Sequence, residues 1–265
     1  MSRVRSTDGT EIAYDKVGAG LPVVLVGGAF SYRKFPRAVE LAELLGERFT
    51  VINYDRRGRG DSGDTAPYSV EREIEDLDVL IAAAGGTAYV WGQSSGGVLA
   101  LRAAAAGLAI EKLAIFEPPF RLAGQGEPPP PDFATRLNEM IAADRRSQAV
   151  KYFMTKGLEA PSLFISVLRF ARPIWSRLTA VAHTLPYDLA VMGDTIKGKP
   201  LSPSEWESVR AQTLILSGAK SKERVRSAGS ALAEALPNAR HQVLEGQSYN
   251  IKMRPLAPVL TEFFA

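Results

Sequence analysis

The chain has 265 residues, of which 46% are hydrophobic and 23% are charged, and its formal net charge is +3. This length suits one large α/β domain with an inserted segment and is too short for two full-sized domains. The 32 basic and 29 acidic residues are interspersed and form no basic stripe, which argues against nucleic acid as a partner. The absence of cysteine excludes disulfides, thiol catalysis and cysteine-bound metal.

The N-terminal residues 1–9 contain no apolar stretch of the kind found in a secretory signal. No later stretch reaches the run of about 18 apolar residues that crosses a bilayer. Together with the lack of cysteine, this pattern predicts a cytoplasmic protein without membrane association. We expect its partner to be a small-molecule substrate and its assembly state to be a monomer or a homodimer.

Strands and helices alternate through the first half of the chain. Residues 2–16 alternate around an Asp8-Gly9 turn and predict a β-hairpin. Short apolar runs predict strands at 22–26, 49–54, 88–91 and 113–116, and helical spacing predicts helices at 71–84 and 98–108. This order is typical of an α/β protein with a mostly parallel, doubly wound sheet.

The alternation stops after Glu117. The proline pair Pro118-Pro119 and the four-proline run 128–131 precede helical spacing that continues to about residue 193. We therefore assign residues 119–193 to an inserted helical lid, and residues 1–118 and 194–265 to the core domain. Within the second part of the core we expect strands at 213–216 and 241–244 and helices at 222–236 and up to residue 264.

A serine motif lies between a predicted strand and a predicted helix. Residues 92–96 read Gly-Gln-Ser-Ser-Gly and match the G-x-S-x-G nucleophile elbow in the context that this elbow requires. The flanking glycines permit a sharp turn that exposes the Ser94 hydroxyl and places the Ser95 N–H at a helix N-terminus, where an oxyanion is favoured. The alternative is that Ser94 only caps the helix.

The chain resembles the α/β-hydrolase superfamily over nearly its whole length. The resemblance is carried by the strand end 26–30 (Val-Gly-Gly-Ala-Phe), the loop 55–62 (Asp-x-Arg-Gly-x-Gly-x-Ser), the serine elbow, the lid and the last two strands. It implies an α/β-hydrolase fold and an oxyanion hole made by the Ala29 and Ser95 N–H groups. Gly27 stands where many members have a structural histidine, a departure that leaves this hole intact.

The resemblance places the catalytic histidine after the last strand, where this sequence has Tyr249. A phenol, whose ordinary pKa is near 10, is a poor general base at neutral pH. The chain has two histidines. We expect His241 at the amino end of the last strand with a structural role, and His183 in the lid, from where it is an alternative base for Ser94.

The position of the usual catalytic acid is also altered. The resemblance places that acid in the loop after strand 213–216, where the sequence has Ser221. Glu117, at the end of strand 113–116, is the alternative acid that some family members use. Its other possible roles are a salt bridge or an N-terminal cap for the lid.

These residues predict an enzyme that binds a small carbonyl compound and directs elimination, cyclisation or isomerisation without hydrolysis. In this reading Tyr249 donates a proton or a hydrogen bond, and Ser94 orients the substrate. Candidate substrate contacts are Phe30, Tyr32, Gln93, Phe120 and Trp175, although core packing explains the aromatic ones equally well.

Two other functions stay open from the sequence: a serine esterase with His183 or a water chain as base, and a catalytically inactive ligand-binding protein. No G-x-G-x-x-G follows a strand, so no dinucleotide cofactor is expected. The scattered carboxylates and two distant histidines predict no metal site.

Overall fold

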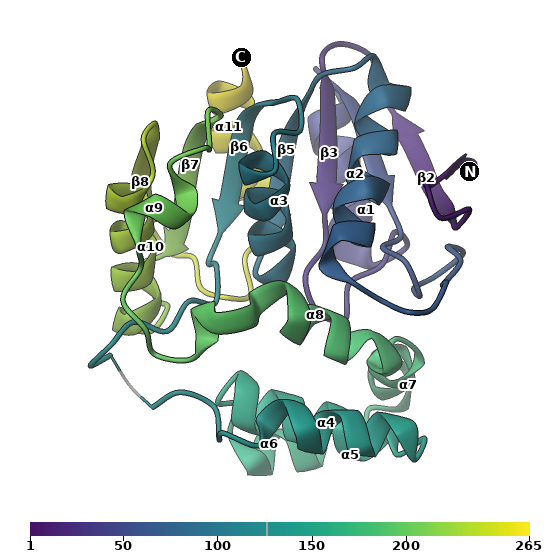
Figure 1. The fold of residues 1–265 in the computed structure, drawn as a ribbon, viewed down its shortest axis with the longest axis vertical. Helices are drawn as coiled ribbons and strands as arrows, with labels where there is room; N and C mark the ends of the chain where they lie inside the picture. The colour runs from purple at the N-terminus through teal and green to yellow at the C-terminus, as the bar shows by residue number, and fades with distance from the viewer. Residues whose placement is uncertain (126) are drawn as a thin grey trace.

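A computed structural model of the chain describes residues 1–125 and 127–265, and residue 126 of the predicted lid lies outside the described residues. It contains an eight-stranded sheet of order β1-β2-β4-β3-β5-β6-β7-β8 (Figure 1). β1 pairs antiparallel with β2, β2 pairs antiparallel with β4, and the remaining neighbours are parallel. The strands are β1 (Ser2–Arg5), β2 (Glu11–Val17), β3 (Pro22–Val26), β4 (Thr50–Tyr54), β5 (Ala88–Gln93), β6 (Ile110–Phe116), β7 (Gln212–Gly218) and β8 (Ala239–Leu244). The predicted α/β fold with a mostly parallel sheet is confirmed.

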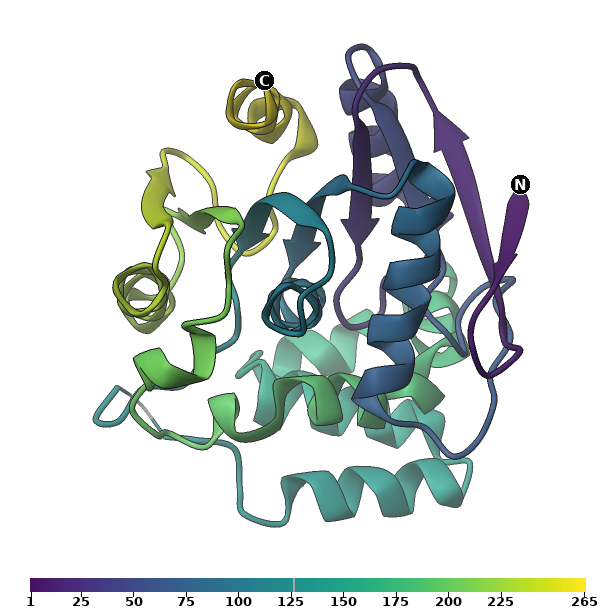
Figure 2. The same cartoon turned by 45° about the horizontal axis from the view of Figure 1, so that its top comes forward.

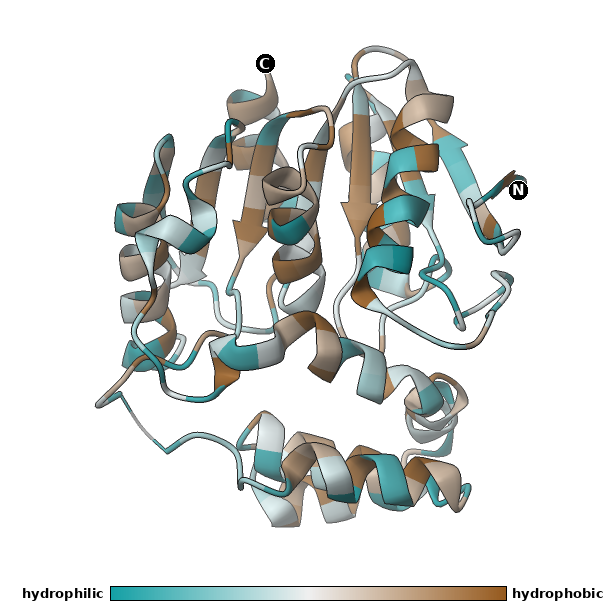
Figure 3. Ribbon diagram, viewed as in Figure 1, coloured by the Kyte–Doolittle hydropathy of each residue, from teal (hydrophilic) through white to brown (hydrophobic). Residues whose placement is uncertain are grey.

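Helices cover both faces of the sheet (Figure 2). On one face α1 (Pro36–Gly46) and α11 (Met253–Phe264) pack against the strands. On the other face lie α2 (Val70–Ala84), α3 (Ser95–Ala105) and α10 (Glu223–Ala235). The central strands are therefore buried on both sides, which explains the apolar run along β3 and the apolar residues 113–116 that end β6, where the hydrophobic colour dominates (Figure 3).

Two helices differ from the sequence prediction. α1 was not predicted, although its buried Leu41 and Leu45 are spaced by one helical turn and Pro36 occupies its first turn. α3 begins at Ser95, three residues before the predicted start, because Gly96 and Gly97 lack the apolar side chains that mark a helix in a sequence.

A group of helices crosses the carboxyl ends of the parallel strands (Figure 1). It comprises α4 (Phe133–Ala142), α5 (Arg146–Tyr152), α6 (Ser162–Leu168), α7 (Arg172–Ala180) and α8 (Leu185–Met192), with π-helical or 3₁₀ turns at Phe153–Gly157, Ala182–Thr184 and Gly193–Ile196. These helices share an apolar core of their own, whereas the short α9 (Pro203–Trp206) leads back to β7. Among the described residues, no helix has both the length and the apolar character that crossing a membrane requires.

Candidate active site

Ser94 lies at the sharp turn between β5 and α3. Its φ of 53° and ψ of −127° are a backbone conformation that side-chain-bearing residues rarely adopt. Close packing on both sides requires glycine: a Cβ on Gly96 would lie 2.3 Å from the Val26 carbonyl oxygen, and one on Gly92 would lie 2.5 Å from the Gly97 Cα. The Ser94 side chain makes no capping hydrogen bond to α3, so the geometry is that of the nucleophile elbow and not of a helix cap.

Ala29 and Ser95, whose N–H groups are the predicted oxyanion donors, line cavities together with Ser94. Ala29 and Ser94 line the same two cavities, and Ser95 lines the larger one. The hydrogen bonds of the described residues give neither N–H an acceptor. Both groups are therefore available to an oxygen atom of a ligand placed beside Ser94.

The buried carboxylate of Asp188, in α8, accepts a hydrogen bond from the Ser95 side chain. The Ser95 hydroxyl donates to Asp188 Oδ1 at 2.8 Å, and Arg56 and Arg59 each donate to the same carboxylate at 2.7 Å. Arg59 also donates to the Gly28 carbonyl at 2.7 Å, next to Ala29. Asp188 therefore connects the segment after β3, which carries the Ala29 N–H, to α3, which carries the Ser95 N–H. The link to the first segment runs through Arg59 and the Gly28 carbonyl.

This network is buried and balanced in charge. Arg56 donates to both oxygens of Glu73, at 2.6 and 2.7 Å, so that two guanidinium groups face two carboxylates. Burial alone would raise the pKa of Asp188, but Arg59 and Arg56 hold that pKa below its ordinary value. Asp188 is therefore ionised at neutral pH and keeps both arginines compensated.

Tyr249 follows β8 and lines both cavities together with Ser94. Its residue surface is 44% exposed. Burial raises the pKa of Tyr249, and the neighbouring Ser94 hydroxyl offsets this rise only in part. The phenol therefore stays protonated at neutral pH.

Glu117 lies at the end of β6, with a φ of 47°. Its Oε1 accepts hydrogen bonds from the Gly218 N–H at 2.9 Å and from the Ser221 hydroxyl. Its Oε2 is buried and has no partner among the described residues, and the side chain lines the larger cavity. Burial raises the pKa of this carboxyl, against the opposing effect of Ser221, Gly218 and Arg224. One carboxylate oxygen is therefore left to face a ligand.

Both histidines lie away from Ser94. His183 Nε2 is 2.7 Å from the Gly58 carbonyl oxygen, and the ring lines a separate hollow beside Tyr32. His241 lies within β8, which begins two residues before the predicted start of this strand, and its Nε2 is 2.9 Å from the Ser217 hydroxyl. Neither ring lines the two cavities that contain Ser94.

The larger cavity has a volume of about 640 Å³, within the range of small-molecule sites. Ser94, Glu117 and Tyr249 line it from the sheet side. Apolar side chains from the crossing helices line the other side: Phe133, Phe153, Met154, Leu158, Phe164, Leu168, Ile174, Leu178 and Met192. A smaller cavity of about 220 Å³ adjoins Ser94 on the side of α1.

Comparison with known proteins agrees with this geometry. Residues 23–249 match the model of the alpha/beta hydrolase family. The chain belongs to the α/β-hydrolase family. An α/β hydrolase from Sphaerobacter thermophilus has a similar structure, with 49% identity, a TM-score of 0.92 and 100% of each chain covered.

More distant relatives share the fold alone. A hydrolase from Pseudomonas aeruginosa is 23% identical over 100% of this chain and 98% of its own, with a TM-score of 0.74. The enol-lactonase from Burkholderia xenovorans is 18% identical over 99% of each chain, with a TM-score of 0.72. These likenesses assign no reaction to this α/β-hydrolase-family chain.

The predicted substrate contacts fall into two groups in this α/β-hydrolase-family protein. Phe30, Tyr32 and Gln93 line the smaller cavity with Ser94. Phe120 instead stacks on Trp206 in the core, with ring centroids 6.3 Å apart. Trp175 lies among the crossing helices, and its Nε1 donates to Ser147 at 3.0 Å. Neither Phe120 nor Trp175 lines a cavity that contains Ser94, so core packing explains both.

Proposed function

We propose that this protein is an enzyme that acts on a small carbonyl compound by proton transfer, in an elimination, cyclisation or isomerisation, without an acyl-enzyme. The observation that carries the proposal is that the Ser94 hydroxyl adjoins the Tyr249 phenol and no imidazole. Activation of a serine for ester hydrolysis needs a base that takes its proton. A phenol with a raised pKa is already protonated and cannot take it.

The proposed step uses the unpartnered oxygen of Glu117. The carboxylate takes a proton from the carbon next to the substrate carbonyl, and the electron pair of the broken C–H bond forms a C=C bond. The carbonyl oxygen becomes an enolate oxygen, which the Ala29 and Ser95 N–H groups stabilise. Ser94 and Tyr249 orient the substrate through hydrogen bonds, and the proton held by Glu117 returns to the product or passes to the leaving group.

We further propose that residues 119–193 serve as a lid over this site. Their apolar side chains form the far wall of the larger cavity. Exclusion of water by such a wall strengthens the hydrogen bonds to an enolate and protects it from bulk proton exchange. The lid assignment therefore fits a reaction in which water is not a substrate.

Replacing Tyr249 with His should create a reactive serine in a protein that lacks one. The imidazole would share the larger cavity with the Ser94 hydroxyl and with the unpartnered Oε2 of Glu117, which would supply the orienting carboxylate of a triad. We expect no labelling of the native chain by a fluorophosphonate and no turnover of short-chain nitrophenyl esters, and a gain of both in Tyr249→His.

The control is the double variant Ser94→Ala, Tyr249→His, which should lose the labelling again. Robust labelling of native Ser94 would contradict the proposal and favour the serine esterase. In that case His183→Ala would show whether His183 is the base, although its ring now contacts the Gly58 carbonyl.

The pH dependence tests the role of Glu117. The measured quantity is deuterium incorporation next to the carbonyl of small ketones and thioesters in D₂O, followed by NMR. A carboxylate base works only when ionised, so exchange should increase as the pH rises through the pKa of Glu117. Because burial raises that pKa, the midpoint should lie above the ordinary value of 4.5.

Glu117→Gln should remove the enzyme-dependent exchange while preserving the hydrogen bonds that its side-chain oxygen accepts from Gly218 and Ser221. Full exchange in this variant would exclude Glu117 as the base. Binding of carbonyl compounds without any exchange or turnover would favour the ligand-binding alternative.

A further inference from the structure

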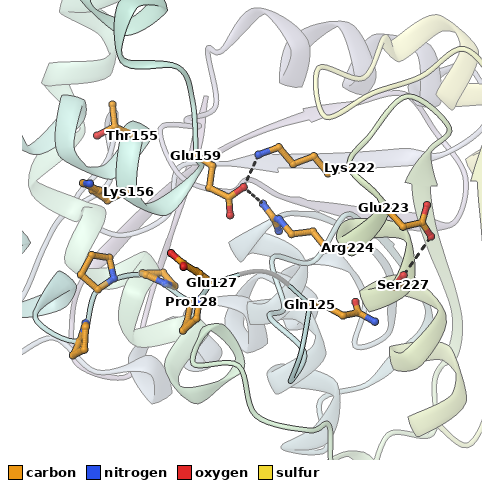
Figure 4. A pocket seen from close by; sticks show the side chains of 13 residues that line it. Gln125, Glu127, Pro128, Thr155, Lys156, Glu159, Lys222, Glu223, Arg224 and Ser227 are labelled. Carbon is orange, nitrogen blue, oxygen red and sulfur yellow. Dashed lines mark hydrogen bonds and ion pairs between the residues drawn. The ribbon is translucent and has the colours of Figure 1, made fainter.

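A cluster of basic side chains lies at the entrance of the larger cavity. Arg121 follows β6, while Lys222 and Arg224 lie at the start of α10, after β7. All three line the cavity that contains Ser94. Lys222 and Arg224 also line a wide hollow of about 1080 Å³ outside it (Figure 4). The two spaces meet at these cations, so a molecule that enters from the hollow passes them before it reaches Ser94.

The cluster carries more positive charge than its carboxylate partner offsets. Arg121, Lys222 and Arg224 all bind Glu159, with the Lys222 Nζ at 2.5 Å and an Arg224 nitrogen at 3.4 Å from its Oε2. Figure 4 shows Lys222 and Arg224 pointing toward this carboxylate. The charged residues that line the larger cavity are Arg37, Arg121, Lys220, Lys222 and Arg224 against the single acid Glu117. With Glu159 included, five cations face two carboxylates.

One donor of the cluster has no acceptor. Arg224 Nε is buried and makes no hydrogen bond to any described residue. Arg121 next to it is only 4% exposed, so two guanidinium groups are held close together with little contact with water. A buried donor without an acceptor costs about 1–3 kcal/mol. An anionic ligand oxygen would satisfy this donor and offset the surplus charge.

We propose that Arg121, Lys222 and Arg224 form a subsite for an anionic group, and that the substrate is a carbonyl compound carrying a carboxylate or a phosphate. This inference rests on the proposed function, because it takes the Ser94 end of the cavity as the place of reaction. The carbonyl lies at Ser94, the apolar middle of the substrate contacts the lid residues, and the anionic group binds the arginines. Guanidinium groups suit this role because their paired N–H groups match the oxygens of either anion.

Binding of three probes with the same alkyl chain tests the subsite: octanoate, octyl phosphate and octanol, measured by calorimetric titration of the full chain. We expect the native protein to bind at least one of the two anions on the order of tenfold more tightly than octanol. The preferred anion identifies the group that the substrate carries. Arg224→Met should remove the preference and leave octanol binding unchanged, since methionine keeps the apolar stem.

Lys197→Met is the matched control, because it removes the same charge from an exposed side chain paired with Asp194 that does not line the cavity. If Arg224→Met does not fold, Lys222→Met replaces it, since the Lys222 side chain is 55% exposed. Equal binding of the three probes by the native chain would overturn the subsite, as would an anion preference that survives both substitutions.

The alternative is that the three basic residues have only a structural role and hold Glu159 of the lid in place through their ion pairs. That reading predicts a loss of stability in Arg224→Met without a change in the ratio of anion to alcohol affinity. Binding of the alkyl probes needs no catalysis. The titration can therefore show no anion preference while Tyr249→His still gains labelling, and an anion preference can be found while Tyr249→His gains none. The two proposals are therefore tested separately.

Discussion

Replacing Asp188 with Ala should lower the free energy of unfolding by about 3–5 kcal/mol. The substitution leaves Arg56 and Arg59 with Glu73 as their one remaining buried carboxylate, so a positive charge stays buried without compensation. It also removes the acceptor of the Ser95 hydroxyl, next to the N–H that we assign to oxyanion binding. We expect the melting temperature to fall on the order of 10 °C, together with the proton-exchange activity.

The measurement is chemical and thermal denaturation at neutral pH, where the stabilising charge of Asp188 is fully present. Its pKa is lowered in the folded state, so this contribution is lost only as the pH falls through that lowered pKa. The matched control is Asp194→Ala, because Asp194 is exposed and its ion pairs among the described residues are those with Lys197 and Lys199 on the surface. An Asp188→Ala protein as stable as this control would show that the network contributes nothing.

Replacing Gly96 with Ala should separate α3 from β3 and distort the elbow. The added Cβ would lie 2.3 Å from the Val26 carbonyl oxygen and 2.7 Å from the Gly27 carbonyl, and neither backbone group can rotate away. Overpacking of this kind typically costs about 1–3 kcal/mol, and the displaced helix would carry Ser94 and Ser95 with it. We expect a lower denaturation midpoint and the loss of labelling when the substitution is added to Tyr249→His.

Gly63→Ala is the matched control for this experiment. Its Cβ would meet Thr10 Cγ2 at 3.4 Å, an ordinary contact, and Gly63 has no positive φ. Its stability should stay within about 0.5 kcal/mol of the native chain. An equal loss of stability in both variants would show that the tight approach of α3 to β3 is not what the glycine protects.

The parts of the site that the sequence predicted are those defined over a few neighbouring residues. The elbow is such a part, because the glycines around Ser94 and the flanking strand and helix are all visible within about twenty residues. The sheet was predicted for the same reason, since buried parallel strands are short apolar runs. The roles of Tyr249 and Glu117 remain predictions, although the structure brings both residues to the cavity of Ser94.

The parts that the sequence analysis missed depend on contacts between distant segments. Asp188 lies 93 positions from Ser95 and is one of many acidic residues until the fold places it behind the elbow. Nothing local to the basic run around Lys222 and Arg224 shows that Arg121 and Glu159 lie opposite it. Arginines near strand ends do not by themselves predict an anion site, because the sequence does not show the cavity that they line together.

The attachment of α8 to the elbow has a consequence for how this protein can diversify. α8 supplies Asp188, the acceptor shared by Ser95, Arg56 and Arg59. A chimera in which a foreign segment without this aspartate replaces α8 would leave Arg59 without its carboxylate and Arg56 with Glu73 alone. New specificities in this lineage should therefore arise by exchange of single side chains that line the cavity, with α8 retained.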